Sequence, residues 1–338
     1  MQVTEKGSVR VDLVGGTLDL EPINLILKNV VTLNVATDLK AEVRIEKTES
    51  ETIEIHSLDY NKKYIFKEEE LTDDNLYFNN TFKEMSFVLQ VLDLFGFRKS
   101  LNIELKSGAP AGSGLGGSSA MGVTLFKALT KLRGEELDIN QAVLKVKSVE
   151  GRILNRGVPG YQDYFPALLG GVLALRGVPG KIEYEQLYCN ELVRFLEEHL
   201  SLVYSGISRN SGINNWDVYK SFFDGDKKIR SSLESIARIS AQTYEAIREK
   251  NYTSLLELIG QEGEMRKGLA KNIVPDEVDN FSDDLLKSGF ITGMKMCGAG
   301  GGGCFILIHQ KEFISAIESK IKEANFIKLN FKIDRPIQ

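Results

Sequence analysis

A glycine-rich segment at residues 108–121 constrains the fold more than any other part of the chain. It reads Gly-Ala-Pro-Ala-Gly-Ser-Gly-Leu-Gly-Gly-Ser-Ser-Ala-Met, with five glycines and three hydroxyl residues in fourteen positions. An alternating run at 101–106 precedes it and an apolar run at 123–132 follows, which predicts a strand, a loop and then a helix. Glycines let backbone N–H groups approach an anion, and a helix start adds unpaired N–H groups and the positive end of the dipole. The segment therefore predicts a phosphate-binding loop.

Two familiar glycine loops and a plain turn are the alternatives. A P-loop needs a lysine before its last hydroxyl residue, and no lysine lies between residues 107 and 126, so a P-loop is excluded. Gly112, Gly114 and Gly117 match the spacing of a dinucleotide fingerprint, but that unit needs a second strand after its helix. Here another helical pattern follows from about 140. An ordinary tight turn needs only one or two glycines.

The segment from Pro110 to Ala120 resembles the central motif of the GHMP kinases, Pro-x-x-x-Gly-Leu-Gly followed by small and hydroxyl residues. The resemblance implies that this loop holds the phosphates of ATP. A serine at the start of the helix would supply an oxygen to Mg²⁺, with Ser118 preferred over Ser119. The expected ATP-binding residues are Pro110, Gly112, Ser113, Gly114, Leu115, Gly116, Gly117, Ser118 and Ser119.

A second motif lies near the N-terminus, in the run Arg10-Val-Asp-Leu-Val-Gly-Gly-Thr-Leu-Asp19. An arginine at a strand can offer a bidentate cation to a phosphate, and a carboxylate after the turn can accept hydrogen bonds from sugar hydroxyls. A plain strand and turn is the other interpretation. The run resembles the Arg-x-x-x-x-Gly-Gly-x-x-Asp form found in heptose 7-phosphate and fucose kinases, with Leu18 where those kinases usually have threonine. The resemblance implies that Arg10 stabilises the reacting phosphate and that the sugar is bordered by Gly16, Thr17 and Asp19.

Two carboxylates form a third constellation. Glu150 falls late in a predicted helix, and Asp163 follows a loop rich in glycine and proline. One such carboxylate can bind Mg²⁺ while the other faces the nucleophilic hydroxyl. The alternative is that both are ordinary surface acids. The segment 160–163 resembles the Gly-x-x-Asp catalytic motif of galactokinase-like and heptose kinases. That resemblance implies a catalytic Asp163, as a base or as an orienting group, beside a substrate-binding Gln162 and a magnesium ligand at Glu150.

A fourth signal comes from the second half of the chain. Four consecutive glycines at 300–303 exceed the needs of any turn and indicate close approach of a backbone or a ligand. The run resembles the C-terminal GHMP motif, which implies packing against the phosphate loop and substrate contacts from Gly300 and Gly301. The segment 204–211 resembles the Thr-Gly-x-x-Arg-x-Ser segment of heptose kinases, so Arg209 is a candidate for binding a phosphate on the substrate. A surface-loop arginine is the alternative.

Composition narrows the class of protein. A chain of 338 residues that is 42% apolar and 26% charged suits two globular domains. The net charge of −5 gives no basic footprint for nucleic acid, and no apolar stretch approaches a membrane span. Three scattered cysteines favour a reducing compartment, and the N-terminus shows no signal peptide, so we expect a cytoplasmic protein. The three histidines have no metal-binding spacing.

The pattern of elements predicts an α+β protein with domains at 1–180 and 181–338. Short β-type runs dominate the first hundred residues, and glycines and prolines near 177–180 mark the boundary. The resemblance implies the GHMP fold, with a ribosomal-S5-domain-2-like N-terminal domain and a ferredoxin-like C-terminal domain. Helical patterns are predicted at 73–95, 118–132, 140–154, 214–224, 227–249, 253–270, 276–288 and 311–324.

These features together predict an ATP- and Mg²⁺-dependent sugar kinase. The favoured substrate is a heptose phosphate, D-glycero-D-manno-heptose 7-phosphate, phosphorylated on its anomeric hydroxyl to the 1,7-bisphosphate. A kinase of another sugar, such as a fucose- or galactose-like sugar, or of a mevalonate-type alcohol is an alternative. A catalytically silent relative that binds ligand as a sensor is a further one. The expected partner is a small sugar or sugar phosphate, with no nucleic acid or membrane, and nothing in the chain predicts the oligomeric state.

Overall fold

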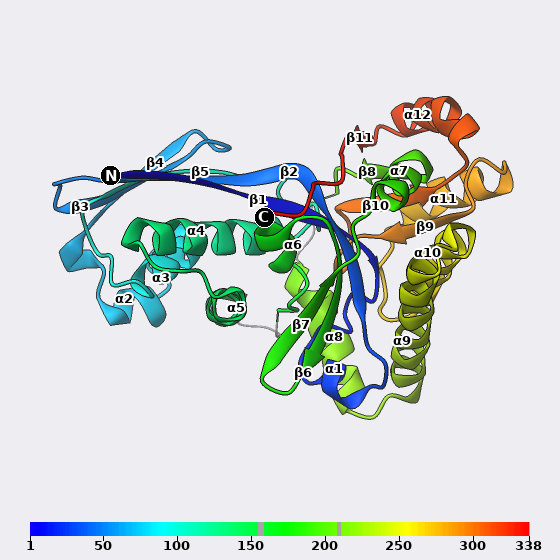
Figure 1. Cartoon of the computed structure of the whole chain (residues 1–338), viewed down its shortest axis with the longest axis horizontal. Coiled ribbons are helices and arrows are strands. Elements are labelled where there is room, and N and C mark those ends of the chain that lie inside the picture. Colours follow the sequence, from blue (N-terminus) through cyan, green and yellow to red (C-terminus); the bar gives the residue numbers. More distant parts are fainter. Residues whose placement is uncertain (155–158, 208–210, 338) are drawn as a thin grey trace.

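A computed structural model describes residues 1–154, 159–207 and 211–337, apart from the side chains of 211–214. Two β-sheets, each with its own helices, make up the molecule (Figure 1). The longer sheet and the helices beneath it occupy one side of the view, and the smaller sheet with its helices occupies the other. This arrangement agrees with the predicted α+β class.

The first sheet contains seven strands within the described residues, in the order β4-β3-β5-β2-β6-β7, with β1 paired to β2. Only β3 and β5 run parallel; the other pairs are antiparallel. Burial alternates along β5, as expected for a sheet covered on one face. The strands are β1 (Gln2–Val14), β2 (Thr32–Lys47), β3 (Thr52–Ser57), β4 (Lys62–Lys67), β5 (Leu101–Lys106), β6 (Val172–Val178) and β7 (Lys181–Gln186).

Helices cover the lower face of this sheet in Figure 1, and α4 lies centrally against β1 and β2. The predicted helix at 73–95 is wrong in its middle, because Asn80 and Lys83 adopt left-handed backbone conformations that separate α2 from α3. The helices of this half are α1 (Ile23–Ile26), α2 (Asp73–Tyr77), α3 (Ser86–Asp93), α4 (Gly117–Arg133), α5 (Ile139–Leu154) and α6 (Phe165–Leu169).

The second sheet is antiparallel, with the order β11-β8-β10-β9. Helix α10 packs on β9 and pairs with the long helix α9. The short α7 was not predicted. The strands are β8 (Leu200–Tyr204), β9 (Gly293–Met296), β10 (Cys304–Ile308) and β11 (Ile327–Leu329). The helices are α7 (Asn190–His199), α8 (Ser211–Phe223), α9 (Lys227–Arg248), α10 (Tyr252–Lys267), α11 (Asp276–Lys287) and α12 (Ile314–Glu323).

The two halves are joined in more than one place. The predicted boundary at residue 180 falls in the turn between β6 and β7, and both of these strands belong to the first sheet. The chain also returns at its C-terminus, where Ile333 forms a bridge with Thr37 of β2. The exact domain limits stay a prediction. In the part of the chain that the structure describes, no helix is both long and apolar enough to cross a membrane.

Candidate active site

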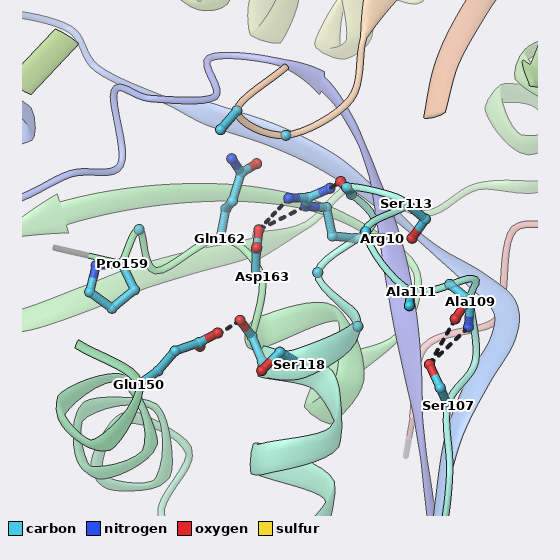
Figure 2. A pocket seen from close by; sticks show the side chains of 18 of the residues that line it. Arg10, Ser107, Ala109, Ala111, Ser113, Ser118, Glu150, Pro159, Gln162 and Asp163 are labelled. Carbon is cyan, nitrogen blue, oxygen red and sulfur yellow. Dashed lines mark hydrogen bonds and ion pairs between the residues drawn. The ribbon is translucent and has the colours of Figure 1, made fainter. Parts of the chain in front are cut away.

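A cleft of about 590 Å³ opens where the glycine loop before α4 meets the loop that carries Asp163 (Figure 2). Most of its walls come from the first half of the chain, while Asn215, Gly298 and Ala299 come from the second half. The cleft therefore lies between the two halves of the molecule, and ligands of two-domain proteins commonly bind in such a place.

The predicted phosphate loop forms one wall. Gly112, Gly114 and Gly116 all have positive φ, of 70°, 78° and 73°, a conformation that favours glycine. Gly116 is also the N-cap of the seventeen-residue helix α4, and no side chain within the described part of the chain caps that helix. The N-terminal N–H groups of α4 are thus left for an anion. Ser118, in the first turn, is exposed and lines the cleft.

The glycine run at 300–303 supports this loop from behind. The Ser113 carbonyl accepts a hydrogen bond from the Cys304 N–H at 2.6 Å. A Cβ on Gly303 would lie 2.5 Å from the Ser113 carbonyl oxygen, so only glycine fits there. The first turn of the loop closes on itself, since the Ser113 N–H donates to the Pro110 carbonyl. The expected packing of the C-terminal glycine run on the phosphate loop is present in the structure.

Arg10 and Asp163 form an ion pair at the centre of the cleft (Figure 2). Arg10 Nε and Nη2 both donate to Asp163 Oδ1, at 2.8 and 2.6 Å, and Nη1 donates to the Gly114 carbonyl at 2.5 Å. Burial alone would lower the pKa of this guanidinium, but the carboxylates of Asp163 and Asp12 raise it, so Arg10 stays charged. Arg10 is 2% exposed, whereas the Asp163 side chain is 27% exposed and reaches the cleft.

Asp19 lines the cleft beside Gly160 and Gln162. Its Oδ2 accepts the Gln162 N–H at 3.0 Å. The carboxylate lies so close to Gly160 that a Cβ at that position would lie 1.9 Å from Asp19 Oδ2. Burial, followed by the negative charge of Asp163, raises the pKa of Asp19 to about 6. Thr17 and Gln162 line the cleft nearby. This end of the cleft therefore offers carboxylate and polar groups to a hydroxyl-bearing ligand.

Glu150 lies near the C-terminal end of α5 and lines the cleft. Its Oε2 accepts hydrogen bonds from Ser119 Oγ at 2.7 Å and from the Tyr164 hydroxyl at 2.6 Å. Burial raises the pKa of this carboxyl, although both hydrogen bonds oppose the rise. Ser118 and Glu150 supply the hard oxygen donors that suit Mg²⁺. Among the described residues, no group of three or more acidic, histidine or cysteine side chains is placed to hold a metal ion.

Some predicted substrate residues lie elsewhere. Among the described residues that line the cleft, the C-terminal run contributes Gly298 and Ala299. Gly300 and Gly301 lie instead on Ile273, whose carbonyl accepts the Gly301 N–H at 2.7 Å. Arg209 lies outside the described residues.

Two further residues of the N-terminal motif, Gly16 and Leu18, are not among the residues that line the cleft. Leu18 is fully buried in an apolar cluster with Leu233 of α9 and Leu269, so its side chain belongs to the core. Gly16 sits against the Arg266 guanidinium, behind the cleft wall. Thr17 and Asp19 are the residues of this motif that line the cleft.

Sequence reasoning missed a buried charged cluster behind the cleft, made of Asp12, Glu262, Arg266 and Lys295, each at most 1% exposed. Lys295 Nζ lies 2.5 Å from Asp12 Oδ2 and 3.6 Å from Glu262 Oε2, and Arg266 Nη2 donates to Glu262 Oε1. Burial would raise the pKa of Asp12, but Lys295, Arg10 and Arg266 lower it to about 2. The one available signal was the pair of helix glycines, Gly260 and Gly263, which allow α10 to approach β9 closely.

Comparison with known proteins identifies the family. A model of the GHMP kinase N-terminal domain matches residues 80–171, and a model of the GHMP kinase C-terminal domain matches residues 243–327. The two matches cover just over half of the chain. The chain belongs to the GHMP kinase family. GHMP kinases are ATP-dependent phosphotransferases, and the predicted family and fold are confirmed.

Relatives within the GHMP kinases act on different substrates. The chain is 26% identical to an L-fucokinase/L-fucose-1-P guanylyltransferase of Bacteroides fragilis, over 90% of this chain but only 34% of the relative. It is 24% identical to a D-glycero-alpha-D-manno-heptose 7-phosphate kinase of Campylobacter jejuni, over 68% of this chain and 67% of the relative. The mevalonate kinase structure of Methanococcus jannaschii superposes with a TM-score of 0.75 at 20% identity, covering 98% of both chains. The relatives therefore define a kinase family without fixing the substrate.

Proposed function

We propose that this GHMP kinase transfers the γ-phosphoryl group of ATP to a sugar hydroxyl, with the anomeric hydroxyl of a heptose 7-phosphate as the favoured acceptor. One observation carries the proposal: the Arg10–Asp163 pair lies between the glycine loop and the polar end of the cleft. A Cβ on Gly116 would lie 3.1 Å from Asp163 Cγ, so the carboxylate adjoins the loop. Asp19, whose pKa responds to the charge of Asp163, accepts the backbone N–H of Gln162, the residue before Asp163.

Each group has a distinct task in this proposal. The positive-φ glycines and the uncapped start of α4 receive the triphosphate, and Arg10 offsets charge that develops on the transferred group. Asp163 orients the attacking hydroxyl or accepts its proton, while Arg10 fixes the carboxylate through two hydrogen bonds. Asp19 and Thr17 border the sugar. Mg²⁺ held by Ser118 and Glu150 would neutralise charge on the phosphate oxygens.

The fucokinase and heptose phosphate kinase relatives, together with the motif at 10–19, support a sugar acceptor, and the Campylobacter relative supports a heptose phosphate. A neutral sugar is the second candidate, for a specific reason. Among the described residues that line the cleft, Arg10 is the only cation, and its guanidinium is already paired with Asp163. A substrate phosphate would then depend on Arg209, which lies outside the described residues.

The test is ADP release with a panel of acceptors: heptose 7-phosphate, free heptose, L-fucose, galactose and mevalonate. The proposal expects turnover with a sugar and favours the heptose phosphate. If Arg209 binds a substrate phosphate, Arg209→Ala weakens heptose 7-phosphate more than the unphosphorylated parent sugar. Equal effects on both would argue that the substrate carries no phosphate near Arg209. An absence of turnover with every acceptor, while ATP still binds, would support a ligand sensor and overturn the proposal.

A further inference from the structure

Arg266 is a buried residue whose hydrogen bonds end on the cleft wall. It lies on α10 and is 1% exposed. Its Nη1 donates to Thr17 Oγ1 at 3.2 Å and to the Gly298 carbonyl at 3.1 Å. Thr17 and Gly298 both line the cleft, although they are far apart in the sequence. A single guanidinium from the second half of the chain therefore connects two pieces of the wall.

Thr17 needs such support because its backbone is strained. Its φ is 71°, in the left-handed region, which β-branched residues rarely adopt. Such a conformation costs on the order of 1–3 kcal/mol and persists only where the surroundings hold it. The hydrogen bond from Arg266 reaches the Thr17 side chain directly. The strained residue is also one that the proposed function places beside the sugar.

Gly16 makes room for the same guanidinium. A Cβ on Gly16 would lie 2.5 Å from Arg266 Nη2, and the φ of Gly16 is outside the left-handed region. Lack of space, rather than backbone conformation, thus explains this glycine. The guanidinium packs directly on the backbone of the turn that leads into Thr17.

Gly298, the other piece of the cleft wall, is held by hydrogen bonds at both its N–H and its carbonyl. The Gly298 N–H donates to Asp12 Oδ1 at 2.9 Å, while its carbonyl accepts from Arg266. Asp12 is in turn paired with Lys295. Glu262 accepts from Arg266 Nη2 at 3.2 Å, so both terminal nitrogens of the guanidinium have acceptors. The planar fork of arginine can serve three acceptors at once, which a lysine ammonium cannot reproduce in the same geometry.

We propose that Arg266 is a positioning residue that sets the shape of the acceptor subsite by fixing Thr17 and Gly298. The effect of Arg266 on acceptor binding rests on the proposed function, whereas its effect on the structure of the 15–19 turn does not. Among the described residues, the hydrogen bonds and ion pair of Arg266 go to Thr17, Gly298 and Glu262 and not to α4 or Glu150, so nucleotide binding should be spared.

The test compares Arg266→Lys with Arg248→Lys, the same exchange at an exposed arginine of α9 that does not line the cleft. Loss of hydrogen bonds to a charged group predicts a rise of ~10-fold or more in the KM of the acceptor for Arg266→Lys. The KM of ATP should stay close to that of the wild type, and Arg248→Lys should change neither. An unchanged acceptor KM, or equal losses for acceptor and ATP, would overturn the proposal.

A second readout is independent of turnover. Hydrogen–deuterium exchange of peptides spanning 13–20 should accelerate in Arg266→Lys, while exchange of peptides spanning 110–120 should stay unchanged. If the wild type phosphorylates no acceptor, the proposed function fails and this exchange pattern still decides the role of Arg266. Should Arg266→Lys not fold, Gly16→Ala displaces the guanidinium with its charge intact and is expected to give the same local acceleration. Wild-type exchange rates at 13–20 in the folded variant would refute the role.

Discussion

Replacing Asp19 with asparagine should stabilise the protein above neutral pH while impairing sugar binding. Asp19 is 2% exposed and its pKa is raised to about 6 by burial and by the charge of Asp163. The folded state thus holds a proton on this carboxyl that the unfolded state, with a pKa near 3.8, has released. Stability therefore falls as pH rises from about 4 to beyond 6, where the ionised carboxylate must stay buried.

The magnitude follows from the size of the shift. A change from 3.8 to about 6 corresponds to about 3 kcal/mol of destabilisation at high pH, since one pKa unit is about 1.4 kcal/mol. The asparagine carbonyl can still accept the Gln162 N–H, and the strength of that bond to the ionised carboxylate is already contained in the shifted pKa. Asp19→Asn should thus exceed the wild type in unfolding free energy by about 3 kcal/mol at pH 8 and by little at pH 4.

The assay is urea unfolding followed by circular dichroism at pH 4 and pH 8, with the KM of the acceptor measured at pH 8. The exposed acid Glu257, changed to glutamine, provides the control, and its effect should be small at both pH values. The acceptor KM of Asp19→Asn should rise, because an amide is a weaker acceptor for sugar hydroxyls than a carboxylate. A stability difference that is the same at both pH values would refute the reasoning.

Three other predictions concern the reacting centre. Asp163→Asn should leave ATP affinity nearly intact and lower turnover by roughly 10²–10⁴, and unchanged turnover in a rapid-quench assay would remove the assigned role. Gly116→Ala should impair turnover strongly, whereas Gly134→Ala, at the other end of α4 with a similar φ and open space around it, should only lower the melting temperature; equal kinetic effects would contradict the model. Glu150→Gln should raise the Mg²⁺ concentration needed for half-maximal activity, and an unchanged magnesium titration would exclude Glu150 as a ligand.

Much of the fold followed from local patterns. The strand, glycine loop and helix around 108–121 were predictable because strand alternation, glycine content and helical spacing are all encoded within one short segment. The break between α2 and α3 was missed because apolar spacing continues across Asn80 and Lys83, and that spacing carries no information about the left-handed backbone of these two residues. Strand β7 was assigned to the second half because glycines and a proline precede it, yet a tight turn pairs it with β6.

The site was predictable where a motif carries its own chemistry, as for Arg10 and Asp163, which the structure joins in one ion pair. The cluster around Arg266 was not predictable from the sequence. Glu262 and Arg266 are four residues apart on a helix, a spacing typical of solvated ion pairs, and only the close packing of α10 on β9 buries them. Within a run of glycines, sequence alone likewise cannot tell which ones face a ligand and which face Ile273.

The most direct test of the central claim is ³¹P NMR of ATP, Mg²⁺ and heptose 7-phosphate incubated with the wild-type protein, with Asp163→Asn in parallel. The account predicts a new phosphomonoester signal coupled to the anomeric proton, forming together with ADP in the wild-type sample and nearly absent with Asp163→Asn. The same experiment on L-fucose covers the neutral-sugar candidate. A folded, ATP-binding wild-type protein that produces no sugar phosphate from either compound, or an Asp163→Asn variant as active as the wild type, would contradict it.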